Sequence, residues 1–134
     1  MAAIKHRLHG GCVACGDNNP AGLRLKFEAQ PDGSVKAAAF CARELTGYDG
    51  LLHGGVTALM LDSAMTNCLF AAGITALTAE MTVKYKATVS IGRAVTLTAK
   101  IEKDQDPLFL VGAQLLQDGL LKASAQAKFL RTVG

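Results

Sequence analysis

The sequence predicts an α+β fold in which an antiparallel sheet of about six strands surrounds one long helix. Residues 54–72 are apolar on every side and lack the alternation of a strand, whereas segments before and after them alternate between apolar and polar residues. Short turn sequences join the later segments, which indicates antiparallel neighbours. A helix that is apolar all round must be covered, and a sheet curled around it is the simplest cover.

The N-terminal part of the chain is predicted to be a loop followed by two strands. Residues 1–22 contain glycines and an Asn-Asn-Pro sequence, which break regular structure. Residues 23–30 then alternate between apolar and polar side chains, as expected of a half-buried strand. A turn sequence over residues 31–34 leads to a second strand over residues 35–40.

The apolar run over residues 54–72 is predicted to be a buried helix. Its Ala, Leu and Met content favours a helix, and Gly73 is a typical stop. The 19 residues of the run are long enough to span a membrane. Asp62 in the middle would cost roughly 2.5–3.5 kcal/mol there, however. We therefore expect this helix inside a water-soluble protein.

Four strands are expected after the helix, over residues 81–89, 95–102, 108–116 and 121–130, because each segment alternates with a period of two. The predicted order is therefore two strands, one helix and four strands. No linker sequence interrupts it. We expect a single domain over residues 1–134, in which residues 1–22 form an N-terminal loop region.

The composition excludes several classes of protein. Half of the 134 residues are hydrophobic and 19% are charged, so the chain is not intrinsically disordered. A net charge of +3 is too small for nucleic-acid binding but suits an anionic ligand. The first residues lack the apolar segment of a secretion signal. We therefore expect a cytoplasmic protein with four free thiols and no membrane partner.

Asp62 is the strongest candidate for a catalytic group. Between residues 51 and 79 only His53 and Asp62 are acids or bases, apart from thiols, and no Lys or Arg on the helix neutralises the carboxylate. Asp62 either accepts hydrogen bonds from nearby hydroxyls or loop amides, or it acts as a general base or nucleophile, which we favour. The sequence His53-Gly54-Gly55 stands where the helix begins, and free N–H groups there can stabilise an oxyanion. His53 equally suits a capping role.

The spacing of Gly54 and Asp62 predicts a site shared by two chains. Eight residues of helix span about 12 Å, so one substrate carbonyl cannot contact both groups of the same chain. Two such helices packed antiparallel would place Gly54 of one chain beside Asp62 of the other. We therefore expect a dimer with its active site at a two-fold interface.

Four groups of residues spread over nearly the whole chain form a specific combination. They are Cys12-Val13-Ala14-Cys15-Gly16 with Asn19-Pro20-Ala21-Gly22-Leu23, then Gly47-Tyr48-Asp49-Gly50-Leu51-Leu52-His53-Gly54-Gly55, then Asp62, and finally Thr78-Ala79-Glu80-Met81-Thr82-Val83-Lys84-Tyr85. Together they resemble the hotdog-fold acyl-CoA thioesterases, in the branch of the phenylacetate-degradation (PaaI-like) enzymes. The resemblance implies a sheet wrapped around a central helix, and dimers that pair into tetramers.

The resemblance also implies a thioester hydrolase that acts on coenzyme A conjugates without a cofactor or metal. The Gly54 N–H would polarise the thioester carbonyl, and Asp62 of the other chain would activate water or attack directly. His53 would position the substrate, and Thr78 would orient the acid or the water. The residues expected to bind the substrate are Gly55, Tyr48 and Leu52.

Two other functions stay open at this point. A non-catalytic acyl-CoA binding protein would use the same pocket, and a hotdog-fold hydratase or dehydratase would need an acid–base pair at the acyl β-carbon. Three cations, Lys84, Lys86 and Arg93, are candidates for contacts to the coenzyme A phosphates, although a solvated strand face explains each of them equally well.

The N-terminal region contains a possible metal motif. His6, His9, Cys12 and Cys15 form the pattern H-x2-H-x2-C-x2-C, and these residue types suit zinc. Four ligands within ten residues rarely surround one ion without a second segment, however. We therefore expect a metal-free loop that covers the mouth of the pocket.

Overall fold

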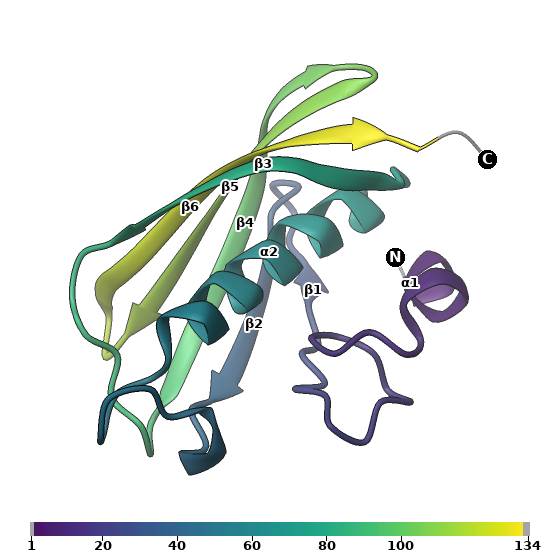
Figure 1. Cartoon of the computed structure of the whole chain (residues 1–134). Coiled ribbons are helices and arrows are strands. Elements are labelled where there is room, and N and C mark those ends of the chain that lie inside the picture. The colour runs from purple at the N-terminus through teal and green to yellow at the C-terminus, as the bar shows by residue number, and fades with distance from the viewer. Residues whose placement is uncertain (1, 133–134) are drawn as a thin grey trace.

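One antiparallel sheet of six strands forms most of the structure, with the strand order β1-β2-β4-β5-β6-β3 (Figure 1). The computed structural model describes residues 2–132 of the chain, with the side chains of residue 5 and residues 7–132. The strands are β1 (Glu28–Ala29), β2 (Val35–Phe40), β3 (Ala76–Tyr85), β4 (Ala94–Gln105), β5 (Leu108–Gln117) and β6 (Leu120–Arg131). The helical elements are α1 (Ala2–His9), the 3-10 turn η1 (Arg43–Leu45) and the long helix α2 (Gly54–Ala71).

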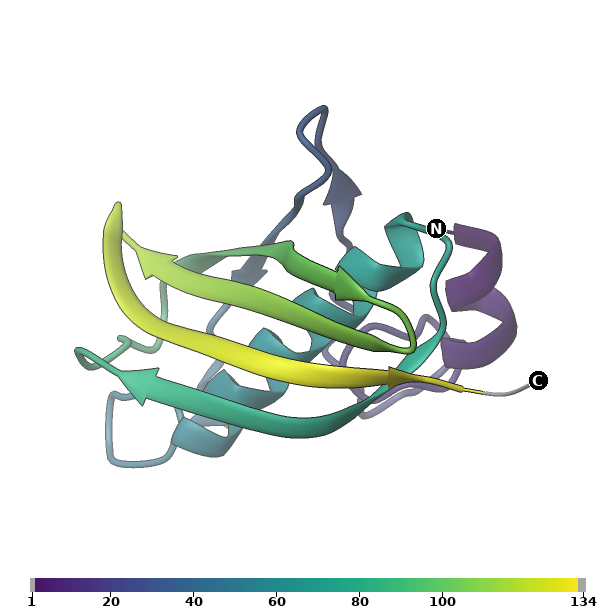
Figure 2. The same cartoon turned by 90° about the horizontal axis from the view of Figure 1, so that it is seen from above.

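Helix α2 lies across the concave face of the sheet, which curves around it (Figure 1, Figure 2). Most of its residues from Met60 to Phe70 are buried, whereas Ala58, Leu59 and Asp62 are only half-buried. The helix ends before Gly73, which adopts a φ of +76° that favours glycine. None of the helices in the described part of the chain has the length and hydropathy that a bilayer-crossing segment requires.

Small side chains on the central strands allow α2 to lie close to the sheet. Burial alternates along β4, β5 and β6, so that every second residue faces the helix. Five of the residues buried there are alanines, namely Ala99, Ala113, Ala123, Ala125 and Ala127, and they alternate with larger buried residues such as Leu97, Phe109 and Phe129. The predicted α+β fold is therefore confirmed, with an open antiparallel sheet packed against one long helix.

The prediction for the first thirty residues is wrong in two places. Residues 2–9, expected to be loop, form α1, which contacts the C-terminal half of α2. Residues 23–30 form a strand only at Glu28–Ala29. The alternating burial is present, but the Leu23 and Leu25 N–H groups donate to the N-terminal loop (Val13 and Ala14 carbonyls, 2.8 and 2.9 Å) instead of to a neighbouring strand. The alternation of apolar and polar residues thus predicted correctly which side chains are buried, but it did not predict the hydrogen-bond partners of the backbone.

Strand β3 begins and ends earlier than its predicted range of 81–89. Its first residues are mostly exposed, because β3 is an edge strand that pairs only with β6 among the described residues. An exposed edge strand shows little alternation of apolar and polar residues, so the first part of β3 could not be predicted from the sequence pattern. After Tyr85 the chain turns, and Val89 accepts a hydrogen bond from the Leu52 N–H (2.8 Å). This bond brings the segment after β3 next to the segment before α2.

Candidate active site

A cleft of about 740 Å³ lies at the N-terminal end of α2. Two stretches of chain form most of it, namely the loop that leads into α2 and the end of β3 with the residues that follow it. The lining residues are Thr46, Gly47, Tyr48, Leu51, Leu52, His53, Gly54, Thr57, Tyr85, Lys86, Ala87, Thr88, Val89 and Ala123. This set includes one Lys and no carboxylate. The cleft therefore suits a ligand with an anionic part and an apolar part.

His53 is the N-cap of α2. Its Nδ1 atom accepts a hydrogen bond from the Gly55 N–H (2.8 Å), which satisfies one of the free amides of the first turn. No described residue accepts a hydrogen bond from the neighbouring Gly54 N–H. The cap thus uses the Gly55 N–H and leaves the Gly54 N–H free at the positive end of the helix dipole, beside the cleft.

Tyr85 holds the same turn from the other side. Its hydroxyl group donates to the Gly54 carbonyl oxygen over 2.8 Å, from the last residue of β3. The Gly54 carbonyl is therefore fixed while its N–H remains available. Sequence reasoning gave Tyr85 no role in the site, and its only signal was its position in the last of the family-like motifs.

Asp62 and Thr78 contact each other within one chain. The Thr78 hydroxyl donates to Asp62 Oδ1 over 2.7 Å, which links the middle of α2 to the start of β3. Asp62 is half-buried, and no ion pair among the described residues involves it. Neither residue lines the cleft at Gly54. In a single chain the free amide and the carboxylate are therefore on separate parts of the surface.

The predicted substrate-binding residues have different positions. Tyr48 and Leu52 line the cleft, and Tyr48 is 87% exposed. Leu52 is buried and forms the apolar base of that region. Gly55 is not among the lining residues, and its N–H is already used by the His53 cap. The cap therefore explains Gly55 without a ligand.

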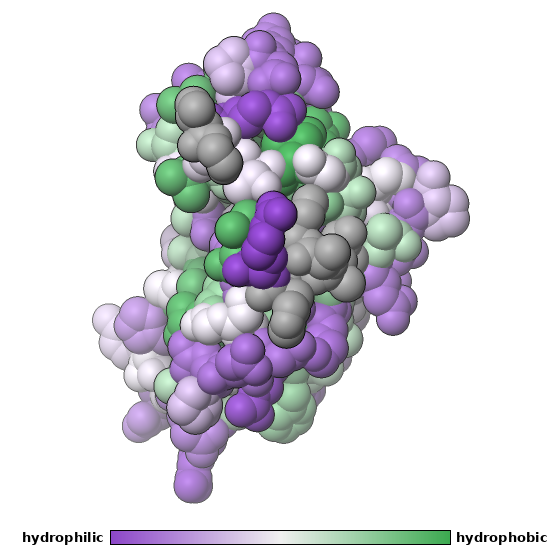
Figure 3. Space-filling model, turned by 90° about the vertical axis from the view of Figure 1, so that its right-hand side faces the viewer, coloured by the Kyte–Doolittle hydropathy of each residue, from purple (hydrophilic) through white to green (hydrophobic). Residues whose placement is uncertain are grey.

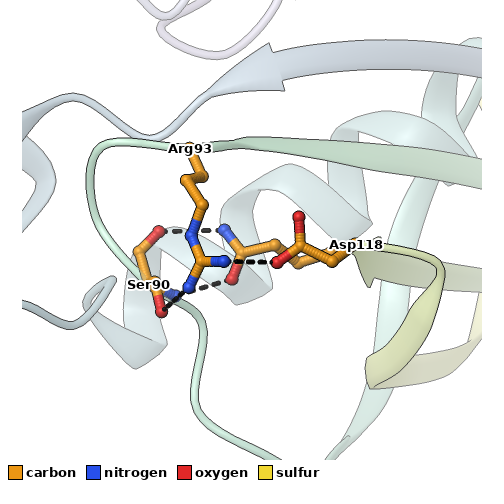
Figure 4. A network of polar contacts seen from close by, with 4 residues as sticks. Ser90, Arg93 and Asp118 are labelled. Atoms are coloured by element: carbon orange, nitrogen blue, oxygen red, sulfur yellow. Dashed lines mark hydrogen bonds and ion pairs between the residues drawn. The ribbon is translucent and has the colours of Figure 1, made fainter.

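The three candidate cations are spread over the molecule. Lys86 lines the cleft, whereas Lys84 lines a separate groove of about 600 Å³ on the outer face of the sheet. Arg93 forms an ion pair with Asp118 (2.6 Å) and also donates to the Ser90 hydroxyl oxygen (3.0 Å; Figure 4). Among these three side chains, only Lys86 is placed to contact a ligand in the cleft.

A buried amide supports the loop beside the cleft. The Gln117 side chain is 2% exposed and exchanges two hydrogen bonds with the Ser90 backbone, at 2.8 and 2.9 Å (Figure 4). Leu51 forms a β-bridge with Ser90, so the loop that leads into α2 is tied to the same point. The end of β5 is thus linked through Ser90 to the loop that leads into α2.

Three members of the possible metal motif lie together. His9, Cys12 and Cys15 each place one ligand atom within 4.8 Å of the others, whereas the His6 side chain lies outside the described residues. Burial lowers the pKa of His9, and the negative charge of Asp62 opposes this effect. Burial raises the pKa of the Cys15 thiol. The cluster lies on the side of the molecule that carries α1, away from the cleft residues.

A family model and a curated relative match the chain. The model of the thioesterase superfamily matches residues 49–123. The acyl-coenzyme A thioesterase 13 of Pongo abelii is 27% identical over 113 residues, which cover 83% of this chain and 81% of the relative.

Solved structures share the fold. The thioesterase superfamily protein RHA08564 has a TM-score of 0.85 at 24% identity over 90% of this chain, which spans only 60% of that protein. The E. coli PaaI protein of the phenylacetic acid degradation operon has a TM-score of 0.77 at 17% identity, covering 84% of this chain and 82% of that one. A thioesterase of Streptococcus pneumoniae, solved with coenzyme A, has a TM-score of 0.75 at 16% identity and covers 81% and 88%. Two further structures of the pneumococcal protein are of variants in which an aspartate or a threonine is replaced by alanine.

Proposed function

The chain belongs to the thioesterase superfamily and is a thioester hydrolase, and we propose that its substrate is an acyl group carried on coenzyme A, which it releases as the free acid. The matched relative is named as an acyl-coenzyme A thioesterase, and a protein of the same fold was solved with coenzyme A. The observation that carries the proposal is the free Gly54 N–H at the start of α2, beside a cleft without carboxylates.

The Gly54 amide stabilises the oxyanion. When the thioester carbonyl is attacked, its oxygen gains negative charge, and an N–H group at a helix N-terminus is already oriented to accept that charge. The Tyr85 hydroxyl holds the Gly54 carbonyl, and the His53 cap holds the turn that follows. Because both contacts exist before the substrate binds, the amide need not reorganise during the reaction.

Asp62 acts on the attacking water as a general base, or attacks the carbonyl itself. In the first case the carboxylate takes a proton from water while the water oxygen bonds to the carbonyl carbon; the C–S bond then breaks, and the sulfur of coenzyme A leaves as a thiolate that takes up that proton. In the second case the carboxylate displaces the thiolate to form a mixed anhydride, which water hydrolyses to the free acid and the regenerated Asp62. The Thr78 hydrogen bond fixes the carboxylate for either role. The aspartate and threonine replaced in the pneumococcal thioesterase are separated by sixteen positions in its chain, the same separation as Asp62 and Thr78.

The complete site requires two chains. Eight residues of helix place Gly54 and Asp62 about 12 Å apart, which is too far for one carbonyl to contact both. Ala58, Leu59 and Asp62 form a half-buried surface on α2, and the edge strand β3 lies beside it, where Thr78 contacts Asp62. A second copy packed there in a two-fold dimer brings the partner subunit's Asp62 to Gly54.

The cleft binds the two ends of the substrate differently. Lys86 is placed for an ionic contact to a phosphate of coenzyme A, and Tyr48 with Leu52 provides apolar surface for the ligand. The four cysteines are free thiols, which fits a protein that works in the reducing cytoplasm.

The test is the release of free thiol from a panel of aliphatic and aromatic acyl-CoA compounds. We expect hydrolysis by the wild type, a loss of at least 100-fold in Asp62→Asn, and wild-type activity in Asp104→Asn, which changes an exposed carboxylate on β4. Binding of every compound without thiol release would instead identify a binding protein. Addition of water to an enoyl-CoA without thiol release would identify a hydratase.

A further inference from the structure

The N-terminal cluster holds three soft ligand atoms at the spacing of a metal site. The distance between Cys15 Sγ and His9 Nδ1 is 3.6 Å, and Cys12 Sγ lies within 4.8 Å of both atoms. A tetrahedral zinc ion with Zn–S bonds of about 2.3 Å and a Zn–N bond of about 2.05 Å would set its sulfur and nitrogen ligands about 3.6 Å apart. The observed separation of the histidine and the cysteine equals this value.

The loop around Cys12 also suits a thiolate. The backbone N–H groups of Ala14 and Cys15 both point to Cys12 Sγ, at 3.4 and 3.5 Å. Amide donors of this kind stabilise a negative sulfur, and a bound metal ion requires the sulfur in that form. Gly16 is buried, and a Cβ atom there would lie only 2.4 Å from the Gly10 carbonyl oxygen. Position 16 therefore has no room for a side chain while the turn holds this arrangement.

The helix below the cluster provides an unused polar atom. Asn67 on α2 is fully buried, and its Oδ1 atom has no hydrogen-bond partner among the described residues. The Asn67 side chain lies close enough to Cys15 to counteract part of the rise in the pKa of that thiol, so this orphan oxygen belongs to a residue that borders the cluster. A buried polar atom without a protein partner is uncommon, and this oxygen is free to accept a hydrogen bond from a water molecule.

From these contacts we propose that His9, Cys12 and Cys15 bind one zinc ion, with water as the fourth ligand and Asn67 Oδ1 as the hydrogen-bond acceptor of that water. Two thiolates and a neutral imidazole balance the charge of Zn²⁺, so the site is neutral where it is half-buried. Binding releases the two thiol protons. This changes the expectation from sequence, because three ligands converge without a second ligating segment.

The site would fasten the N-terminal segment to α2. The His9 ring packs edge-on against Phe70, with ring centroids 5.0 Å apart, and Cys15 is buried beside it. Figure 3 views the molecule from the side on which α1 lies and shows polar and apolar side chains intermixed on that surface. Ala14 and Cys15 already belong to the buried core, and a metal ion that binds only the folded segment would stabilise this attachment further.

The experiment measures metal binding by the full chain, independently of its activity. The protein is stripped with a chelator, kept reduced with a thiol-free reductant, and titrated with Zn²⁺ or with Co²⁺, whose thiolate charge-transfer absorption reports sulfur ligands. We expect one metal ion per chain and a rise in melting temperature on zinc addition. Cys12→Ser should lose both effects. Cys41→Ser, which changes a buried thiol outside the cluster, should retain both.

Three results would overturn the proposal. The first is that the reduced wild type binds no stoichiometric Zn²⁺ or Co²⁺. This result would count against the site even if Cys12 and Cys15 form a disulfide on oxidation. The second is binding that survives Cys12→Ser with unchanged affinity. If circular dichroism shows that Cys12→Ser does not fold, His9→Gln replaces it. The third result is that the Co²⁺ absorption spectrum of His9→Gln is the same as that of the wild type.

Discussion

Replacing Thr78 by valine tests whether this residue acts through Asp62. The change keeps the shape of the side chain and removes the hydroxyl group that donates to Asp62 Oδ1 over 2.7 Å. Hydrogen bonds to charged groups contribute about 1.5–3 kcal/mol. Because Thr78 is exposed in the single chain, we take the lower end, and about 1.4 kcal/mol corresponds to a tenfold change in rate. We therefore expect kcat/KM to fall about tenfold in Thr78→Val.

The double variant separates positioning from direct catalysis. Asp62→Asn alone should reduce kcat/KM by about 10²–10⁴, the usual contribution of a general base. If Thr78 only orients the carboxylate, it has nothing to orient once the charge is gone. The kcat/KM of the double variant should then equal that of Asp62→Asn within about twofold. If the two residues acted independently, their separate losses would multiply.

The assay is thiol release from one acyl-CoA over a range of concentrations, so that kcat and KM are obtained separately. Thr82→Val provides the control, because Thr82 is an exposed threonine of the same strand that lies away from Asp62. Multiplicative effects in the double variant, or a larger loss in Thr78→Val than in Asp62→Asn, would refute the assignment of Asp62 as the base and Thr78 as its positioning residue.

Three further predictions concern the dimer, the loop and the N-terminal turn. Mixed dimers of Asp62→Ala and Gly54→Pro, each inactive alone, should regain activity after subunit exchange because one of their two sites is intact; labelled mixed dimers that stay inactive would contradict a shared site. Gln117→Ala should lower the free energy of unfolding in urea by about 1–3 kcal/mol, since it leaves two backbone groups unpaired. Gly16→Ala should lower the free energy of unfolding by about 1–3 kcal/mol in the same assay, because its Cβ atom would meet backbone atoms. Gly11→Ala has open space around it and should lower the free energy of unfolding by less than about 0.5 kcal/mol. Equal losses for the two variants would show that the turn at Gly16 can adjust to a side chain.

The fold was predictable where local pattern and burial coincide. An apolar run without alternation can only be a covered helix, and α2 has nearly the predicted bounds, at Gly54–Ala71. The range of β2 was also correct, at residues 35–40, and the ends of the last three strands differ from prediction by at most three residues. The start of β3 was missed because an exposed edge strand has no apolar face to mark it.

The candidate site was predictable only in part. Asp62 and Gly54 are visible in sequence because a lone carboxylate and a pair of glycines interrupt or begin an apolar helix. The hydrogen bond from Tyr85 to Gly54 joins residues 31 positions apart, and no local pattern reports such a contact. The same holds for Leu25, whose N–H donates to the N-terminal loop. Individual hydrogen bonds between residues far apart in the sequence therefore had to come from the structure.

Strand β3 runs back along α2 and touches it at both groups proposed for catalysis. Tyr85, the last residue of the strand, contacts Gly54 at the start of the helix, and Thr78 near the first residue contacts Asp62. The geometry of these groups is therefore encoded within one contiguous stretch, residues 54–85. From outside this stretch, β6 supports both contacts, because it pairs with β3 from Ala76 to Tyr85.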